Sequence, residues 1–148
     1  MNFDLKKGQK RVKNAFTLLE LLVVILILGL LAAFVVPNVI GQKDKAQRKL
    51  VCSQMASIAS ALDMFQMDNG MYPDTEEGLK ALVSNPDPDK YPAYSSKPYL
   101  KRVPKDSWGQ PIQYVKSGEK YDLISFGADR KEGGEGNGAD IKYSQCNK

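Results

Sequence analysis

An apolar segment of membrane length near the N-terminus constrains this chain more than any other feature. Residues 16–40 are nearly all apolar, and Leu21–Val36 contains no charged or hydrogen-bonding side chain. A helix that rises ~1.5 Å per residue would cross most of a ~30 Å hydrocarbon core over that length. The basic residues before the segment indicate an N-terminus in the cytoplasm. We therefore predict a single transmembrane helix over residues 16–40.

Three common kinds of segment share this pattern: a cleaved secretory signal, an uncleaved signal anchor and a buried core helix. A secretory signal needs small residues at the end of the apolar run, and Ala32 and Ala33 would supply them. The apolar run nevertheless continues through Phe34, Val35 and Val36, beyond any such cleavage site. This continuation argues against an ordinary secretory signal.

The net charge of the chain is confined to its first residues. Lys and Arg outnumber Asp and Glu by 21 to 17, but residues 1–15 alone carry a net charge of +4 and the remainder is neutral. A neutral body offers no electrostatic footprint for a phosphate backbone, so we expect no nucleic-acid binding. The chain also contains no histidine, the commonest general base and transition-metal ligand. Because no catalytic constellation stands out, we predict that the protein is not an enzyme.

Glu20 places a carboxylate inside the apolar segment. Burial of this charge in lipid would cost on the order of 3 kcal/mol. Cleavage of the chain just before Phe16 would create an α-amino cation in the same membrane layer, and that cation could pair with Glu20 of a neighbouring copy. We therefore interpret Glu20 as an assembly residue.

The sequence around Glu20 resembles the class III signal of type IV pilins and pseudopilins. The resemblance is carried by Lys13, Asn14, Ala15, Phe16, Thr17, Leu18, Leu19, Glu20, Leu21, Leu22, Val23 and Val24. It implies that residues 1–15 are a basic leader, that a prepilin peptidase cleaves between Ala15 and Phe16, and that the new amine of Phe16 is methylated. The family usually has glycine before the cut, so Ala15 predicts slower processing.

Pro37 lies near the end of the apolar run. A proline inside a helix removes one backbone hydrogen bond and clashes with the preceding turn, which predicts a local kink or local melting. An ordinary helix boundary is the alternative. In the pilin-like family a proline at this place lets the helix loosen when subunits pack, so the resemblance makes Pro37 a second assembly residue.

Residues 41–148 are expected to form one globular domain, which begins with an amphipathic helix over residues 41–69. Apolar side chains recur there at helical spacing, at Val51, Met55, Ile58, Leu62 and Phe65. Asn69 and Gly70 are a natural helix stop. One face of this helix is therefore predicted to pack against the rest of the domain.

The rest of the domain is expected to hold a short helix, a loop and a small sheet. We expect residues 70–104 to form a short helix, capped by Asp74 or Thr75, and then an irregular proline-rich loop. Within residues 105–148, Ile112–Val115 and Tyr121–Phe126 read as two strands joined by a glycine turn. The predicted fold class is α+β, with a small antiparallel sheet packed on the long helix.

Residues 126–141 combine a very flexible backbone with oxygen-bearing side chains at irregular spacing. Such a loop is costly to order without a ligand, and its carboxylates repel one another. Calcium accepts carboxylates and backbone carbonyls together, whereas the spacing matches neither an EF-hand nor a phosphate loop. A calcium loop and a solvated loop both remain open on composition alone.

The C-terminal region resembles the major pseudopilin of type II secretion systems. The resemblance is carried by Trp108, Gly109, Gln110, Pro111, Tyr121, Asp122, Gly127, Ala128, Asp129, Gly133, Gly134, Glu135, Gly136, Ala139, Asp140 and Ile141. It implies a type IV pilin-like fold with a C-terminal calcium loop. The implied ligands are the side chains of Asp129 and Asp140, the main-chain carbonyls of Phe126 and Lys131, and Glu135 as a weaker candidate.

The two cysteines, Cys52 and Cys146, lie far apart in the sequence. Their spacing matches neither a zinc knuckle nor a Cys-x-x-Cys redox site. We expect one structural disulfide that ties the C-terminus to the helix, with two free thiols as the alternative.

These resemblances imply a structural subunit that polymerises into the periplasmic pseudopilus of a type II secretion system. The implied partners are further copies of the chain, minor pseudopilins, the prepilin peptidase and the inner-membrane assembly platform. The implied location is the inner membrane, with a single span and a periplasmic globular domain, and then the assembled filament. A type IV pilin or DNA-uptake pseudopilin would share the first forty residues but would usually lack the Gly-rich acidic loop. A membrane-anchored periplasmic enzyme would need a catalytic constellation.

Overall fold

The computed structural model describes residues 15–147, except for the side chains of residues 35–40. Residues 1–14 of the predicted leader therefore lie outside the described part. The chain divides into two compact units, Met1–Ile40 and Gly41–Lys148. Helix α1 begins at Leu18 and ends at Asn69, so it contributes to both units.

The first unit presents an apolar helical surface. The exposed fractions of its large apolar side chains range from 46% at Val23 to 89% at Phe16. Among the residues described, no helix is both long enough and apolar enough to cross a membrane. The span predicted over residues 16–40 includes residues 35–40, whose side chains lie outside the described part, and it stays a prediction.

Pro37 lies inside α1, and the helix continues through it. The alternative of an ordinary helix boundary at Pro37 is therefore wrong, whereas the kink and the loosening when subunits pack stay predictions. A single proline removes one hydrogen bond of the helix, and the turns on both sides keep theirs. The side chain of Pro37 lies outside the described part.

The second unit is built around the predicted apolar face of α1. Val51, Met55, Ile58, Leu62 and Phe65 are each fully buried, which confirms the amphipathic helix. Burial of a side chain of this size contributes about 1.5–3 kcal/mol. The helix ends where predicted, with Gly70 at φ +80° and its N–H bonded to the carbonyl of Gln66.

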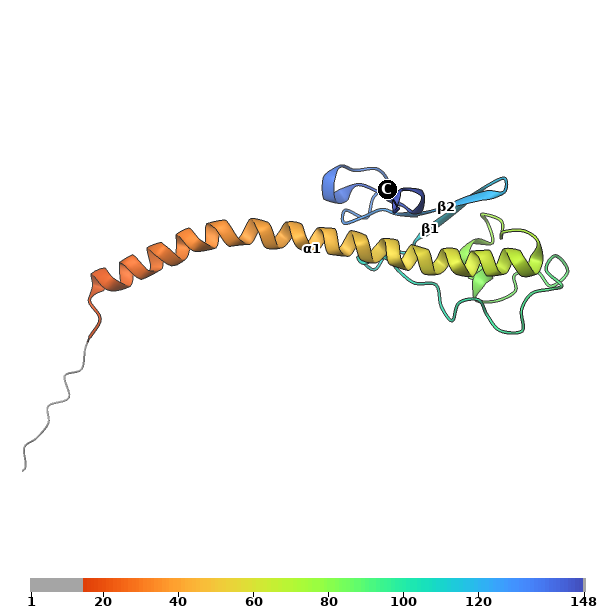
Figure 1. Ribbon diagram of the computed structural model, residues 1–148, viewed down its shortest axis with the longest axis horizontal. Helices are drawn as coiled ribbons and strands as arrows, with labels where there is room; N and C mark the ends of the chain where they lie inside the picture. The colour runs from red at the N-terminus through yellow and green to blue at the C-terminus, as the bar shows by residue number, and fades with distance from the viewer. Residues whose placement is uncertain (1–14, 148) are drawn as a thin grey trace, which may run out of the picture. The chain divides into compact units, whose positions relative to one another are not determined.

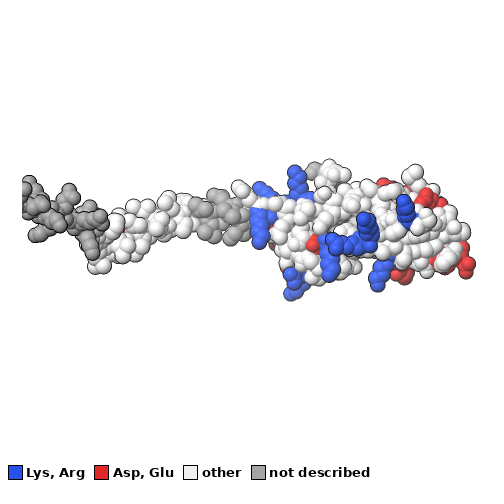
Figure 2. Space-filling model, turned by 90° about the horizontal axis from the view of Figure 1, so that it is seen from below, with Lys and Arg blue, Asp and Glu red and all other residues white. Residues whose placement is uncertain are grey.

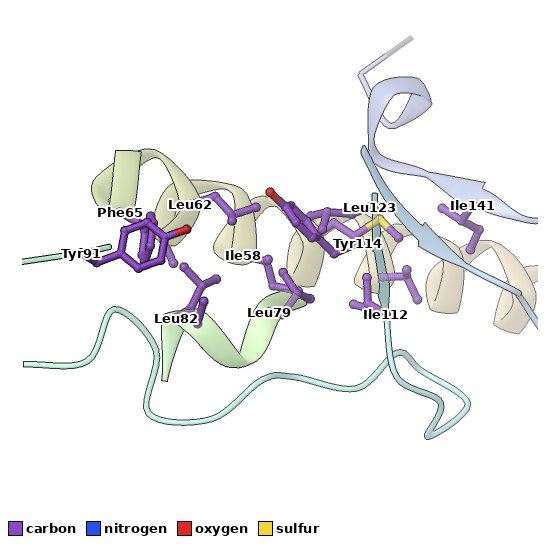
Figure 3. Packing of buried hydrophobic residues seen from close by; sticks show 14 residues of the cluster. Ile58, Leu62, Phe65, Leu79, Leu82, Tyr91, Ile112, Tyr114, Leu123 and Ile141 are labelled. Atoms are coloured by element: carbon purple, nitrogen blue, oxygen red, sulfur yellow. The ribbon is translucent and has the colours of Figure 1, made fainter. Parts of the chain in front are cut away.

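The core is completed by side chains from the short helix Gly78–Leu82, the loops and the sheet (Figure 3). Those facing the helix are Leu79, Ala81, Leu82, Tyr91, Ile112, Tyr114, Leu123 and Ile141. Phe65 meets the ring of Tyr91 edge-on, with centroids 5.0 Å apart. Trp108 is half-buried against the same cluster.

The sheet has three antiparallel strands in the order β1-β2-β3, beside α1 in the second unit (Figure 1). Strand β1 is Gln113–Ser117, β2 is Lys120–Ser125 and β3 is Ile141–Lys142. Both predicted strands are present, and the predicted α+β architecture is confirmed. The hairpin turn is tighter than expected, because Ser117 pairs with Lys120 and only Gly118 and Glu119 lie between them.

Within residues 15–147 there are also three short 3₁₀ helices: η1 at Gly78–Leu82, η2 at Gly136–Gly138 and η3 at Tyr143–Gln145. The capping role predicted for Asp74 or Thr75 at the start of η1 is wrong. The carboxylate of Asp74 pairs with Lys90 and Lys116, and the hydroxyl of Thr75 accepts a bond from the Lys116 N–H. Contacts distant in sequence therefore replace the local cap.

The ion pairs of Asp74 predict a pH-dependent stability. Hydrogen bonds from Lys116 and Lys90 lower the pKa of Asp74 to about 2. Because this pKa lies below the unfolded value, the stabilisation is present above about pH 4 and is lost as the pH falls toward about 2. The side chain is 44% exposed, so we expect screening to limit the loss to about 1 kcal/mol.

Chemical denaturation between about pH 4 and pH 2 measures this effect. The free energy of unfolding should fall less steeply with acid in Asp74→Asn than in the wild type. Asp89→Asn removes an exposed carboxylate nearby and serves as the control. Equal slopes for the wild type and Asp74→Asn would contradict the prediction.

Candidate functional site

The predicted assembly residue Glu20 lies in the first turn of α1 and closes a capping box with Thr17. The Thr17 N–H donates to Glu20 Oε2 at 2.9 Å, and the Glu20 N–H donates to Thr17 Oγ1 at 3.2 Å. Each side chain thus satisfies a backbone donor at the end of the helix. The Thr-x-x-Glu pattern before an apolar run is a known signature of this motif, so the sequence contains the signal for this cap.

This capping box assigns Glu20 a role within its own chain. A carboxylate in the first turn also interacts favourably with the helix dipole. Phe16, the residue predicted to become the new N-terminus, directly precedes Thr17. The pairing of Glu20 with the amine of another copy requires a cleaved end and a second chain, and it stays a prediction.

Asp129 lies at the start of the Gly-rich loop, and the loop folds tightly around it. Its Oδ1 accepts a hydrogen bond from the Lys131 N–H at 3.0 Å. A Cβ at Gly134 would come within 2.7 Å of Asp129 Oδ2, and one at Gly138 within 2.8 Å. Only glycine at these two positions lets the backbone approach the carboxylate so closely.

Asp140 closes the same loop from its C-terminal side. Its Oδ2 accepts a hydrogen bond from the Gly133 N–H at 3.0 Å, and its own N–H bonds the Gly133 carbonyl at 3.2 Å. Its Oδ1 is buried and has no hydrogen-bond partner among the described residues. A buried oxygen left in this state costs about 1–3 kcal/mol, so it is a candidate ligand atom for a cation.

The structure brings Asp129 and Asp140 to adjoining glycines, Gly134 and Gly133, at the centre of the loop. The backbone of the loop is strained, since Arg130 adopts a positive φ of 61° without being glycine. Such a conformation costs about 1–2 kcal/mol. The loop therefore holds its two carboxylates close to the same stretch of backbone at a cost in strain.

The other predicted ligands differ in their exposure. Phe126 is half-buried, and Lys131 and Glu135 are exposed. The Glu135 carboxylate makes no hydrogen bond or ion pair within residues 15–147. The described residues also contain no group of three or more His, Cys, Asp or Glu side chains arranged to hold a metal. Any cation here would therefore depend on backbone carbonyls as well as carboxylates.

Charges of both signs occupy the surface of the second unit. Figure 2 shows Lys and Arg side chains along the visible face and acidic side chains mainly toward one end. This mixture agrees with the neutral balance of the chain beyond residue 15. It offers no uniformly basic surface on that face for a phosphate backbone.

Comparisons with known proteins match nearly the whole chain. Residues 38–144 match the family described as type II secretion system (T2SS), protein G, and residues 10–36 match the prokaryotic N-terminal methylation motif. The chain is 47% identical to the type II secretion system core protein G of Vibrio cholerae over 139 residues, which cover 93% of this chain and 94% of the relative. It is 48% identical to the core protein G of Pseudomonas aeruginosa over 136 residues, covering 90% and 96%.

A solved structure extends this likeness to the fold. The major pseudopilin from the type 2 secretion system of enterohaemorrhagic Escherichia coli is similar with a TM-score of 0.61 and 39% identity. The match covers 73% of this chain and 95% of that one. This protein therefore belongs to the protein G family of the type II secretion system.

Proposed function

We propose that this protein is the major pseudopilin of a type II secretion system. Its copies polymerise into the periplasmic pseudopilus, which drives protein export across the outer membrane. The family match across the globular domain, joined to a methylation motif at the N-terminus, carries the proposal. The function is structural and involves no catalysis by this chain.

The exposed apolar surface of α1 supports two steps of this function, the anchoring of the subunit in the membrane and its packing into the filament. Side chains from Leu18 to Phe34 are exposed around the whole helix, and a helix that is apolar all round needs a lipid or protein environment. In our proposal, residues 16–40 first anchor the subunit in the inner membrane, with the globular domain in the periplasm. The same helices then pack against one another in the filament core.

Processing prepares the subunit for this assembly. The methylation motif supports cleavage between Ala15 and Phe16 by a prepilin peptidase, followed by methylation of the Phe16 amine. Minor pseudopilins and an inner-membrane assembly platform would be the remaining partners. The comparisons favour this secretion role over a type IV pilin or a DNA-uptake pseudopilin.

Complementation tests the proposed function. The gene would be expressed in a bacterium that has a type II secretion system but lacks its own protein G. We expect recovery of secretion, sheared periplasmic filaments that contain this chain, and an intact mass that begins at methylated Phe16. Filaments without restored secretion would instead favour the type IV pilin reading, and a retained leader would contradict the cleavage site.

We further propose that the Gly-rich loop binds calcium. The unpartnered Asp140 Oδ1 and the Asp129 carboxylate are hard oxygen ligands that suit this ion. The carbonyls of Phe126 and Lys131 would add neutral ligands, with Glu135 as a weaker candidate. Bound calcium would neutralise the loop and hold it in the form that assembles.

Calcium should stabilise the wild type, and Asp140→Asn should abolish this effect. At a calcium concentration about 100-fold above Kd, the expected stabilisation is about 2.7 kcal/mol. The asparagine side chain can still accept the bond from the Gly133 N–H, so the variant mainly removes charge from the site. Thermal unfolding with calcium and with chelator measures the effect. Asp89→Asn is the control, and a calcium shift that survives in Asp140→Asn would contradict the assignment.

A further inference from the structure

Three residues of α1 hold the C-terminal segment against the helix. Asp44 Oδ2 accepts a hydrogen bond from Asn137 Nδ2, and Arg48 Nη1 donates to the Ala139 carbonyl at 3.0 Å. Cys52 forms a disulfide with Cys146, with their Cα atoms 5.7 Å apart. We call Asp44, Arg48 and Cys52 the helix clamp.

The spacing of the helix clamp explains how one helix holds a whole segment. Its members recur every four residues and therefore lie on one face of α1. Their partners follow one another along residues 137–146 on both sides of Asp140. The clamp thus fastens to α1 the part of the loop that carries a proposed calcium ligand.

Arg48 binds the residue that directly precedes Asp140, the proposed calcium ligand. The Ala139 carbonyl that it binds belongs to the peptide group joined to Asp140. The same carbonyl lies close to Gly127, where an added Cβ would come within 2.8 Å of it. This carbonyl is therefore bonded by Arg48 and closely packed against the backbone at Gly127.

We infer that Arg48 is a positioning residue for the calcium loop, which it links to the helix that forms the filament. This inference rests on the calcium proposal. Through the Ala139 carbonyl, Arg48 keeps Asp140 Oδ1 directed into the loop. The residue serves a cation site although its own charge opposes cation binding.

The two possible roles of Arg48, through its charge or through its hydrogen bond, predict opposite changes in calcium affinity. If Arg48 acted only through its charge, Arg48→Met would bind calcium more tightly, because a nearby positive charge is removed. If Arg48 positions Asp140, the same variant binds calcium more weakly, by roughly tenfold for the loss of one charge-assisted hydrogen bond. Titration calorimetry on the full mature chain in detergent distinguishes the two results.

Lys49→Met is the matched control. It removes the same charge at the next position, and Lys49 makes no hydrogen bond or salt bridge to residues 126–140 in the part of the chain that is described. We expect equal or tighter calcium binding in Lys49→Met. Arg48→Lys keeps the charge and a donor, and should recover part of the lost affinity.

A second variant keeps the test decisive if Arg48→Met does not fold. Asn137→Ala removes the bond to Asp44 without changing any charge, and it should also weaken calcium binding. Hydrogen exchange of residues 138–141 in chelator should accelerate in both variants, while melting temperatures without calcium stay close to that of the wild type.

The outcomes separate the two proposals. A wild type that binds no calcium would overturn the calcium proposal, whereas faster exchange in the variants would still support the clamp. Calcium binding that is unchanged or tighter in Arg48→Met, with unchanged exchange, would overturn the positioning role.

Discussion

Glu20→Gln should abolish filament assembly and leave the start of α1 helical. Glutamine can still accept the hydrogen bond from the Thr17 N–H, so the capping box survives while the charge is lost. The proposed pairing of Glu20 with the Phe16 amine of another copy needs that charge. Electron microscopy of sheared filaments measures assembly, and the intact mass reports whether Phe16 has been exposed.

Thr17→Val is the matched control for the cap. It removes the hydroxyl that accepts from the Glu20 N–H and keeps the carboxylate. Loss of an N-cap costs about 1 kcal/mol of helix stability, so this variant should still assemble. Normal filaments from Glu20→Gln would show that Glu20 serves the cap and that the pairing between copies is not needed.

In the double variant Cys52→Ala/Cys146→Ala, removal of the disulfide should lower the free energy of unfolding by about 4.6 kcal/mol. The bridge closes a loop with a sequence separation of 94 residues, and in the chain-entropy model a loop of this size stabilises the native state by that amount. Beyond this entropic effect, the bridge secures β3 and the buried Ile141 near the helix. Denaturant unfolding without reductant measures the change.

Wild type treated with reductant should lose a similar amount, because both changes release the same loop. Gln145→Ala, an exposed residue beside the bridge, serves as the control and should be close to neutral. A loss below about 1 kcal/mol in the double variant would contradict the chain-entropy account.

The amphipathic helix could be predicted from the sequence, because the spacing that indicates it lies within a short stretch of residues. Val51, Met55, Ile58, Leu62 and Phe65 recur at the period of an α-helix, and all are buried. Because the apolar spacing is repeated over several helical turns, a single residue that departs from it does not change the prediction. The hairpin was also predictable, since Gly118 separates two apolar stretches, although its register needed the observed pairing of Ser117 with Lys120.

The short strand β3 and the start of the short helix η1 could not be predicted from sequence patterns. Strand β3 has only Ile141 and Lys142, too few residues to show a period, and it exists because β2 offers an edge for pairing. The sequence predicted Asp74 as a helix cap because the residues that follow it fit the start of a short helix. In the fold, Lys90 and Lys116 reach it from distant positions, and these ion pairs replaced the local bond.

The sequence alone showed the apolar segment, the amphipathic helix and the Gly-rich acidic loop, because each consists of neighbouring residues or of a regular spacing. Tertiary structure decided which oxygen of Asp140 lacks a partner and which residues of α1 hold the loop. Asp44 and Arg48 meet Asn137 and Ala139 across some ninety positions of sequence. No local pattern encodes such a meeting, because it depends on how the whole core packs.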